Sequence, residues 1–359
     1  MSLSVLHFAT DDKFMPRAIA LFEAAFPRGN IFRLLRKNRP SHFVPLSLAV
    51  TEVEADYFNS AQVREDVRSC QLLVIHGLRS QFVDAVNSAP DSVRVVWCGW
   101  GFDYYTLLEP ALGYALLPLT GALTHSPRLP VEYHPLPKIA ARIDVCSVLP
   151  TEMDALRVAL PQLRGAVHPL RYYTTEDNFE TGPTSMCGAD ILLGNSADPT
   201  NNHLDALEEL NRIGIGDGRI IVPLSYGAEP DYIAAVVQRG TELFGRGFVP
   251  LETFVGLAEF NQLISTCGVV AMNHRRQQAL GTISHALYKG AKAFVRPESP
   301  VFRFYEELGV RIERWEASAD GSFMAPLSAE TVRNNRRIVG EFWSQDRAIA
   351  QVRSLRNYL

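Results

Sequence analysis

Short apolar runs rich in β-branched residues alternate along this chain with longer amphipathic segments, and the alternation occurs in two separate series. This alternation predicts parallel strands covered by helices on both faces, because each crossover between parallel strands has to pass over the sheet. In the first series the expected strands are residues 3–9, 44–50, 71–76, 93–98 and 143–147. In the second series they are residues 190–193, 219–223, 247–250, 268–272, 291–295 and 310–313.

The chain has 359 residues, more than one hydrophobic core usually accommodates, so the two series correspond to two domains. We expect an α/β protein with two Rossmann-like domains facing each other across a cleft, one over residues 1–185 and one over residues 186–341. Residues 330–359 look helical throughout, and the stretch 342–359 is expected to cross back and pack on the first domain. The proline- and glycine-rich residues 109–137 are expected to form an irregular connection.

Composition excludes several classes of protein. The formal net charge of -4 argues against a nucleic-acid partner, because phosphate recognition needs a basic excess. No secretory signal is recognised, and no apolar run approaches the roughly 20 residues of a membrane span. The cysteines lie far apart without a CxxC pair, which favours reduced thiols and a cytoplasmic protein. They are Cys70, Cys98, Cys146, Cys187 and Cys267.

The strongest functional signal covers residues 190–203, where an apolar strand ends in a turn that opens a helix. Small residues in such a turn let backbone N–H groups approach a ligand, and a helix N-terminus favours phosphate or hydroxyl oxygens. The alternative is an ordinary capped turn, which explains the aspartate, proline and threonine but not the asparagines and histidine as economically. The candidate ligand-binding residues are Gly194, Asn195, Ser196, Asp198, Asn202 and His203.

A second signal is the segment 274–282, which follows an expected strand and leads into a helix. Two arginines at a helix N-terminus add to its dipole, and a bound pyrophosphate would relieve that conflict through forked hydrogen bonds. The alternative is an exposed basic turn. The candidates are His274, Arg275, Arg276, Gln278, Gly281 and Thr282.

Two further strand ends of the second series add candidates. Ser225 is placed to bond a phosphate and Tyr226 to stack on a base or ribose, although a plain turn explains them equally well. Glu298 follows a later strand, where its carboxylate would reach a ribose or sugar hydroxyl.

In the first series, Asp103 stands among tryptophans, tyrosines and glycines at the end of a strand. Aromatic surfaces stack on sugar rings, and a carboxylate there would act as general base for an acceptor hydroxyl. Asp11 and Asp12, in the loop after the first strand, are rival bases. The alternative for Asp103 is a structural aromatic cluster with a capping aspartate.

Basic and apolar residues are interleaved in the stretch 28–43, with Arg33, Arg36 and Arg39 among the cations. This pattern suits the headgroup region of an anionic membrane or a lipid diphosphate. A solvated basic face is the alternative. Any membrane association would be peripheral.

Absent motifs also guide the assignment. The sequence contains no Asp-x-Asp pair of the kind that holds a metal–diphosphate complex, and no HxxxH or CxxC metal spacing. It also lacks a Walker lysine loop and a GxSxG elbow. We therefore expect neither a metal site nor a cofactor.

These segments together resemble a known family. ILLGNSADPTNNH, PLSYG, RRQQALGT and RPESPVF, within residues 191–313, are similar to the TDP-N-acetylfucosamine:lipid II N-acetylfucosaminyltransferases of enterobacterial common antigen synthesis (glycosyltransferase family 56). VLHFATDD and WGFDYY correspond more weakly. The resemblance implies a metal-independent fold of the GT-B type that transfers an N-acetylfucosamine-like sugar in surface polysaccharide synthesis. Its donor would be a dTDP-sugar and its acceptor a polyprenyl-diphosphate-linked glycan on the inner leaflet.

A mechanism follows as a hypothesis. Asn195, Ser196, Arg275 and Gln278 would position the nucleotide diphosphate, and Arg275 or Arg276 would offset its developing charge in place of a metal ion. Two other functions stay open: a sugar-nucleotide epimerase on the same scaffold, and a non-catalytic nucleotide-sugar-binding subunit.

Overall fold

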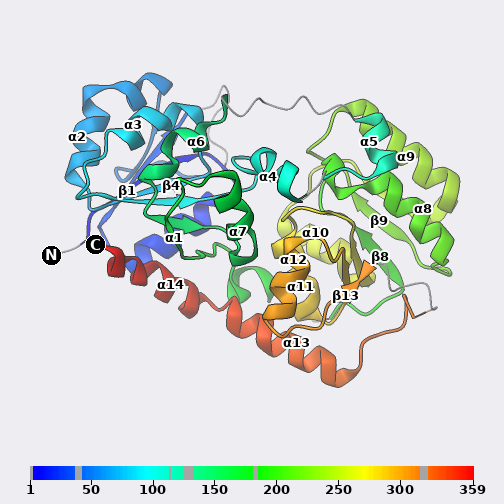
Figure 1. Cartoon of the computed structure of the whole chain (residues 1–359). Helices are drawn as coiled ribbons and strands as arrows, with labels where there is room; N and C mark the ends of the chain where they lie inside the picture. Colours follow the sequence, from blue (N-terminus) through cyan, green and yellow to red (C-terminus); the bar gives the residue numbers. More distant parts are fainter. Residues whose placement is uncertain (1–2, 37–42, 113–114, 125–132, 181–184, 316–321) are drawn as a thin grey trace. The chain divides into compact units, whose positions relative to one another are not determined.

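The computed structural model describes residues 3–36, 43–112, 115–124, 133–180, 185–315 and 322–359 (Figure 1). The chain forms two compact units. Unit 1 comprises Met1–Ala111, Arg128–Tyr173 and Gln345–Leu359, and unit 2 comprises Leu112–Pro127 and Thr174–Ser344. Each unit contains one fully parallel sheet with helices around it, so the expected α/β class with two Rossmann-like domains is confirmed.

The sheet of unit 1 has seven strands in the order β3-β2-β1-β4-β5-β6-β7. The chain runs outward from β1 to β3, returns to pair β4 with β1, and then runs outward in the other direction. The change of direction between β1 and β4 is the switch point, where ligands of open parallel sheets bind. The strands are β1 (Val5–Thr10), β2 (Asn30–Leu35), β3 (Val50–Val53), β4 (Leu72–His76), β5 (Arg94–Cys98), β6 (Val145–Ser147) and β7 (Ala166–Val167).

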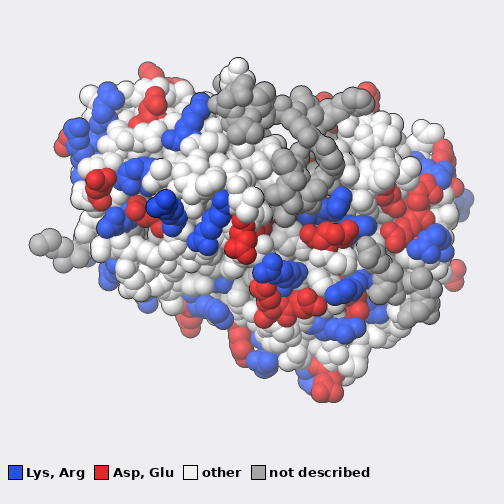
Figure 2. Space-filling model, in the orientation of Figure 1, with Lys and Arg blue, Asp and Glu red and all other residues white. Residues whose placement is uncertain are grey.

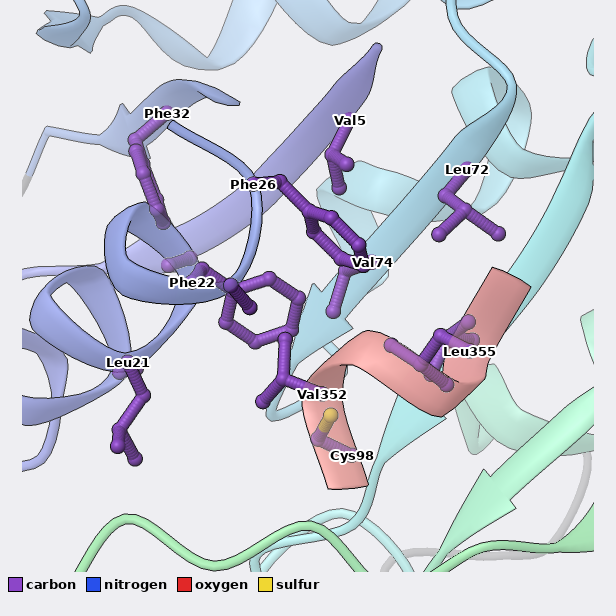
Figure 3. Packing of buried hydrophobic residues seen from close by; sticks show 14 of the residues in the cluster. Val5, Leu21, Phe22, Phe26, Phe32, Leu72, Val74, Cys98, Val352 and Leu355 are labelled. Atoms are coloured by element: carbon purple, nitrogen blue, oxygen red, sulfur yellow. The ribbon is translucent and has the colours of Figure 1, made fainter. Parts of the chain in front are cut away.

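One face of this sheet is covered by the first and last helices of the chain. Figure 3 shows Val352 and Leu355 of the C-terminal segment among Phe22, Phe26 and Val74. The final segment thus completes the core of unit 1, as the sequence predicts. The helices of unit 1 are α1 (Met15–Ala25), α2 (Ala61–Ser69), α3 (Val83–Asn87), α4 (Tyr105–Leu112, whose last residue belongs to unit 2), α6 (Pro135–Ile139), α7 (Pro150–Ala159) and α14 (Gln345–Ser354).

The strand expected at residues 44–50 is wrong, and a strand that was not expected, β2, lies at Asn30–Leu35. Side chains along β2 alternate between buried and more exposed positions, as in a strand with one face on the core. Its arginine, Arg33, bonds Tyr57, Thr51 and Asp66. The basic residues made this stretch look like an exposed segment rather than a strand. Their hydrogen-bond partners come from distant segments and cannot be recognised from the sequence.

The sheet of unit 2 has six strands in the order β10-β9-β8-β11-β12-β13, with its switch point between β8 and β11. Five of the six strands expected in the second series are present, whereas the strand expected at 310–313 is displaced to β13, which overlaps it only at Glu313. The strands are β8 (Asp190–Leu193), β9 (Ile220–Pro223), β10 (Phe248–Leu251), β11 (Cys267–Met272), β12 (Lys292–Val295) and β13 (Glu313–Arg314).

Amphipathic helices close the core of unit 2. In α8, Leu204, Leu207 and Leu210 recur at helical spacing and are buried in the core, each stabilising the fold by about 1.5–3 kcal/mol. The helices of unit 2 are α5 (Pro118–Leu123), α8 (His203–Ile213), α9 (Pro230–Phe244), α10 (Leu257–Leu263), α11 (Leu280–Lys289), α12 (Pro300–Glu307) and α13 (Ala329–Phe342).

The segment Leu112–Pro127 leaves the first series and joins unit 2, which the sequence did not indicate. Two side chains at the start of α8 hold it there. Asn202 accepts a hydrogen bond from Leu117 N and donates one to Ala115 O, while the carboxylate of Asp205 accepts from Leu119 N and Thr120 N at the N-terminus of α5. Proline and glycine in this segment therefore mark a short helix with an external cap.

Candidate functional site

The carboxyl ends of the parallel strands place the predicted donor-binding residues of unit 2 on one edge of its sheet. The loops after β8 and β11 flank the switch point, and the loops after β9 and β12 lie next to them on either side. Each candidate residue from the second series lies in one of these loops or at the helix start that follows. The sheet topology thus brings together segments that are 30 to 100 residues apart in the sequence.

The turn after β8 requires glycine. Gly194 has φ +70°, and a Cβ there would lie 3.0 Å from Nε2 of His203 and 3.2 Å from Oδ1 of Asn201. Its backbone N–H bonds Ala271 O of β11, so the turn is tied to the neighbouring strand. The next residue, Asn195, is half-buried, and its Oδ1 is buried without a hydrogen-bond partner in the structure. Asn195 therefore has an unused hydrogen-bond acceptor at this turn.

Side chains link the loop after β8 to the loop after β11. Arg276 forms an ion pair with Asp198 at 3.0 Å and donates to Oγ1 of Thr200. Gln278 accepts from Thr200 and donates to Oδ1 of Asn201. The protein thus supplies its own carboxylate for Arg276, which relieves part of the conflict that the sequence assigned to a bound anion.

Asn202 and His203 are fully buried and serve the scaffold. Asn202 adopts a left-handed conformation (φ 53°), and besides the bonds to the α5 segment it donates to Asn273 O and Thr200 O. Nδ1 of His203 lies 3.0 Å from the hydroxyl of Tyr232, and burial lowers the pKa of His203 to about 4, so this imidazole is neutral at pH 7. Both residues hold the loop that carries Asn195 and Ser196.

The loop after β11 leads to an accessible helix N-terminus. Arg275, Gly281 and Thr282 are half-buried, while His274 is fully buried. Burial and the charge of Arg276 lower the pKa of His274 to about 3, so it is neutral at pH 7, and its Nε2 has no hydrogen-bond partner in the structure. Ala279, just before α11, has φ +61°, a conformation that costs an alanine about 1–2 kcal/mol. The helix therefore begins abruptly at this edge.

The remaining candidates border this edge. Tyr226 is 42% exposed, and its hydroxyl lies 3.5 Å from Asn195 O, while Ser225 is half-buried. Glu298 lies 3.5 Å from Nε of Arg296, and Nη1 of Arg296 donates to Oδ1 of Asn273. Asn273 and Arg296 were not singled out in the sequence, although both directly follow strands, which is the signal that finds the other candidates.

The three carboxylates of unit 1 occupy different environments. Asp103 is 2% exposed and accepts hydrogen bonds from Leu78 N, Trp97 Nε1 and Trp100 N, each at 2.9 Å. Its burial raises the pKa of this carboxyl, while these hydrogen bonds act in the opposite direction. Its position is that of a group that ties the ends of β4 and β5 together.

Asp11 and Asp12 differ in burial and in the hydrogen bonds that their carboxylates accept. The buried Asp11 carboxylate accepts from Phe43 N at 3.1 Å and Val44 N at 3.0 Å, and it anchors that segment. Asp12 is half-buried and its Oδ1 accepts from Phe14 N at 3.2 Å, with no hydrogen bond to Oδ2 among the described residues. Of the three candidates, Asp12 keeps an oxygen for a substrate.

The described part of the basic stretch is largely neutralised. Arg33 pairs with Asp66, and Arg36 lies near Glu52 and Glu54. Arg39 falls outside the described residues. On the face shown in Figure 2, basic and acidic side chains are interspersed. Among the described helices, none is long and apolar enough to cross a membrane.

Comparison with solved structures gives the same two-domain architecture. The chain matches HepE of Anabaena, solved in complex with UDP and glucose, with a TM-score of 0.66 and 12% identity over 99% of this chain and 100% of the other. It also matches a sucrose-phosphate synthase from Thermosynechococcus elongatus, with a TM-score of 0.67 and 11% identity over 99% and 98% of the two chains. At this identity the likeness shows the fold, which is the GT-B fold of glycosyltransferases.

Comparison with protein families gives the chemistry. Residues 164–309 match the family model described as 4-alpha-L-fucosyltransferase, glycosyl transferase group 56. This region contains the loops after β8, β9, β11 and β12 and every donor-binding candidate, whereas the three carboxylates of unit 1 lie outside it. The matching model is that of the family that the sequence resembles, over residues 164–309, and together with the GT-B fold it makes the protein a glycosyltransferase.

Proposed function

We propose that the protein transfers an N-acetylfucosamine-like deoxysugar from a dTDP-sugar to a polyprenyl-diphosphate-linked glycan. The observation that carries the donor half is the edge of the unit 2 sheet, where the N-terminus of α11 and Arg275 follow β11 at the switch point. Backbone N–H groups in the first turn of a helix and an arginine side chain bind diphosphate oxygens together. HepE, which has the same fold, was solved with UDP and glucose and also with UDP-glucose, which supports a nucleotide-sugar donor.

We assign a small set of groups in unit 2 to direct contact with the donor. Arg275, Asn195 and the N–H groups of Gly281 and Thr282 would bind the diphosphate, while Tyr226 offers an exposed ring for the base. Six other candidates would position these groups without contacting the ligand themselves: Ser196, Asp198, Asn202, His203, Arg276 and Gln278. The neutral imidazole of His274 adds no charge to the site.

The transfer step needs a base for the acceptor hydroxyl. In an inverting displacement the hydroxyl oxygen bonds to the anomeric carbon, the bond from that carbon to the diphosphate oxygen breaks, and the hydroxyl proton passes to a carboxylate. Asp12 is the group we assign to this step, because Asp11 and Asp103 are held by backbone and indole donors. Arg275 and the helix N-terminus would stabilise the diphosphate as it leaves, and no metal ion is then required.

The acceptor and the location rest on the family resemblance. A lipid-linked acceptor requires the protein to work at the cytoplasmic face of a membrane, where it would bind peripherally. The pairing of Arg33 and Arg36 with acidic neighbours means that the stretch from residue 28 contributes its apolar residues more than net charge. Ile31, for example, is 45% exposed.

The direct experiment is a thermal-shift screen with UDP, GDP, TDP and CMP, followed by incubation with the TDP-sugar with and without a lipid-linked acceptor. Ligand linkage should raise the melting temperature for TDP above the others, and sugar should be lost from the donor only into a lipid-linked product. Isomerisation of the TDP-sugar without acceptor would favour an epimerase instead. Binding without turnover would favour a non-catalytic subunit, and a response to no nucleotide would overturn the proposal.

A further inference from the structure

A cation that the proposed mechanism does not use lies at the switch point of unit 1. Arg79 follows β4, two residues after Gly77, whose φ is +67°. A Cβ at Gly77 would lie 3.0 Å from the rings of both Phe102 and Trp100. The absence of a side chain there lets the loop after β5 fold over the end of β4, which places Phe102 next to Arg79.

The guanidinium of Arg79 has a defined position without a polar partner. Its Cζ lies 4.0 Å from the centroid of the Phe102 ring, which is a cation–π distance. Its Nε is buried and unpartnered, and no hydrogen bond or ion pair joins the side chain to any residue that the structure describes. A half-buried guanidinium that has lost water and gained no acceptor is costly.

The nearby carboxylates that the structure describes do not accept a hydrogen bond from Arg79. Coulombic attraction to Asp103 and Asp12 works against the effect of burial, which lowers the pKa of Arg79, and the guanidinium stays charged at pH 7. The Asp103 carboxylate, however, is already engaged by Leu78 N, Trp97 Nε1 and Trp100 N. Asp12 lies close enough to interact electrostatically but forms no ion pair with Arg79 in the described structure.

Two other unused polar groups come from neighbouring elements on the same edge. Nε1 of Trp100, in the loop after β5, is buried without a partner in the structure. Oγ1 of Thr10, the last residue of β1, also has no hydrogen-bond partner among the described residues, and Thr10 is only 3% exposed. Since β1, β4 and β5 are adjacent parallel strands, Thr10, Arg79 and Trp100 lie at or just after three neighbouring strand ends. An indole N–H and a hydroxyl are both able to donate to an oxyanion.

We propose that Arg79, held on Phe102 and assisted by Trp100 and Thr10, binds an oxyanion of the acceptor that presents two oxygens to the guanidinium fork. A phosphate group and a sugar carboxylate share this chemistry. The assignment rests on the proposed transfer to an acceptor, and it places an anionic group of that acceptor beside Asp12. Arg79 is therefore a residue that determines which acceptors bind.

The test uses the full chain saturated with TDP, so that added oxyanions do not occupy the donor site. Inorganic pyrophosphate represents the phosphate source and glucuronate the carboxylate source, each against chloride at equal ionic strength. We expect one of them to raise the melting temperature by about 2 °C or more. Arg79→Gln should abolish this shift, and Arg79→Lys, which keeps the charge but loses the fork, should weaken binding by about tenfold. The response to pyrophosphate or to glucuronate identifies the source.

Arg356→Gln is a matched control, because Arg356 also lies over a phenylalanine of unit 1, with 5.1 Å between its Cζ and the Phe26 centroid. It should leave the oxyanion shift unchanged. No shift with either oxyanion, or an equal shift in wild type and Arg79→Gln, would overturn the assignment; if Arg79→Gln fails to fold, an undiminished response in Arg79→Lys overturns it. Failure of TDP itself to stabilise the protein would count against the proposed function, a separate outcome.

Discussion

The two units have the same kind of switch point and equip it differently. In unit 2 the loops after β8 and β11 are joined by side chains, through Arg276 with Asp198 and Gln278 with Asn201, and the accessible groups are a helix N-terminus and small polar residues. In unit 1 one buried carboxylate, Asp103, and packed aromatic rings hold the loops. The same topology thus carries, in unit 2, the cross-linked loops that we propose as the diphosphate site and, in unit 1, a half-buried carboxylate near an arginine that has no polar partner among the described residues.

The largest expected effect separates Asp12 from Asp103. Asp12→Asn should lower turnover by about 100- to 10,000-fold, the usual contribution of a general base, with an unchanged melting temperature. Asp103→Asn should instead destabilise the fold by about 2–3 kcal/mol, because an amide cannot accept all three hydrogen bonds as a carboxylate does. Steady-state transfer assays and denaturant unfolding measure the two effects. Full activity in Asp12→Asn would remove it as the base.

The next effect tests the part that Asn202 plays in unit 2. Asn202→Ala loses four hydrogen bonds to the backbone and places alanine at φ 53°, so we expect a loss of about 3 kcal/mol in unfolding free energy. Asn202→Gly removes the same bonds without the strain and should cost about 1 kcal/mol less. If both variants were as stable as wild type, the side chain would not anchor the α5 segment.

A smaller effect distinguishes the two neighbouring arginines. Arg275→Gln should weaken TDP binding by about tenfold, since a charge-assisted hydrogen bond to phosphate is lost. Arg276→Gln should lower stability by about 1 kcal/mol, because Asp198 loses its ion pair and keeps only its hydrogen bonds from Thr200, and it should weaken TDP binding less. Isothermal titration and thermal unfolding separate these outcomes. The reverse pattern would exchange the roles of the two residues.

The smallest effect is a change in how the free energy of unfolding depends on pH. The pKa of His203 is about 4 in the folded protein and about 6.5 when unfolded, so between these values only the unfolded chain binds the proton. Stability should therefore fall as pH drops from 6.5 towards 4. His203→Gln should reduce this slope by up to about 1.4 kcal/mol per pH unit, as measured by urea unfolding at several pH values. An identical slope in both proteins would contradict a neutral, buried His203.

Much of unit 2 could be predicted from the sequence, because its strands are short apolar runs that end in turn residues such as Gly194. Unit 1 was harder. In β2, the sequence alone indicates a surface cation at Arg33, whereas in the structure Arg33 bonds Asp66 and Tyr57 from distant segments. The contact between Arg79 and Phe102 could not be predicted either, since the two residues lie in separate loops. Local patterns thus identify strands and caps, whereas long-range pairing decides which polar groups are left for ligands.

We propose that the loops after β8 and β11 bind the nucleoside diphosphate. Amide hydrogen exchange with and without TDP tests it most directly, because protection is measured segment by segment. We expect slower exchange within residues 194–198 and 279–283 and no change in residues 99–104 of unit 1. Protection confined to unit 1, or none in either segment of unit 2 at saturating TDP, would contradict it.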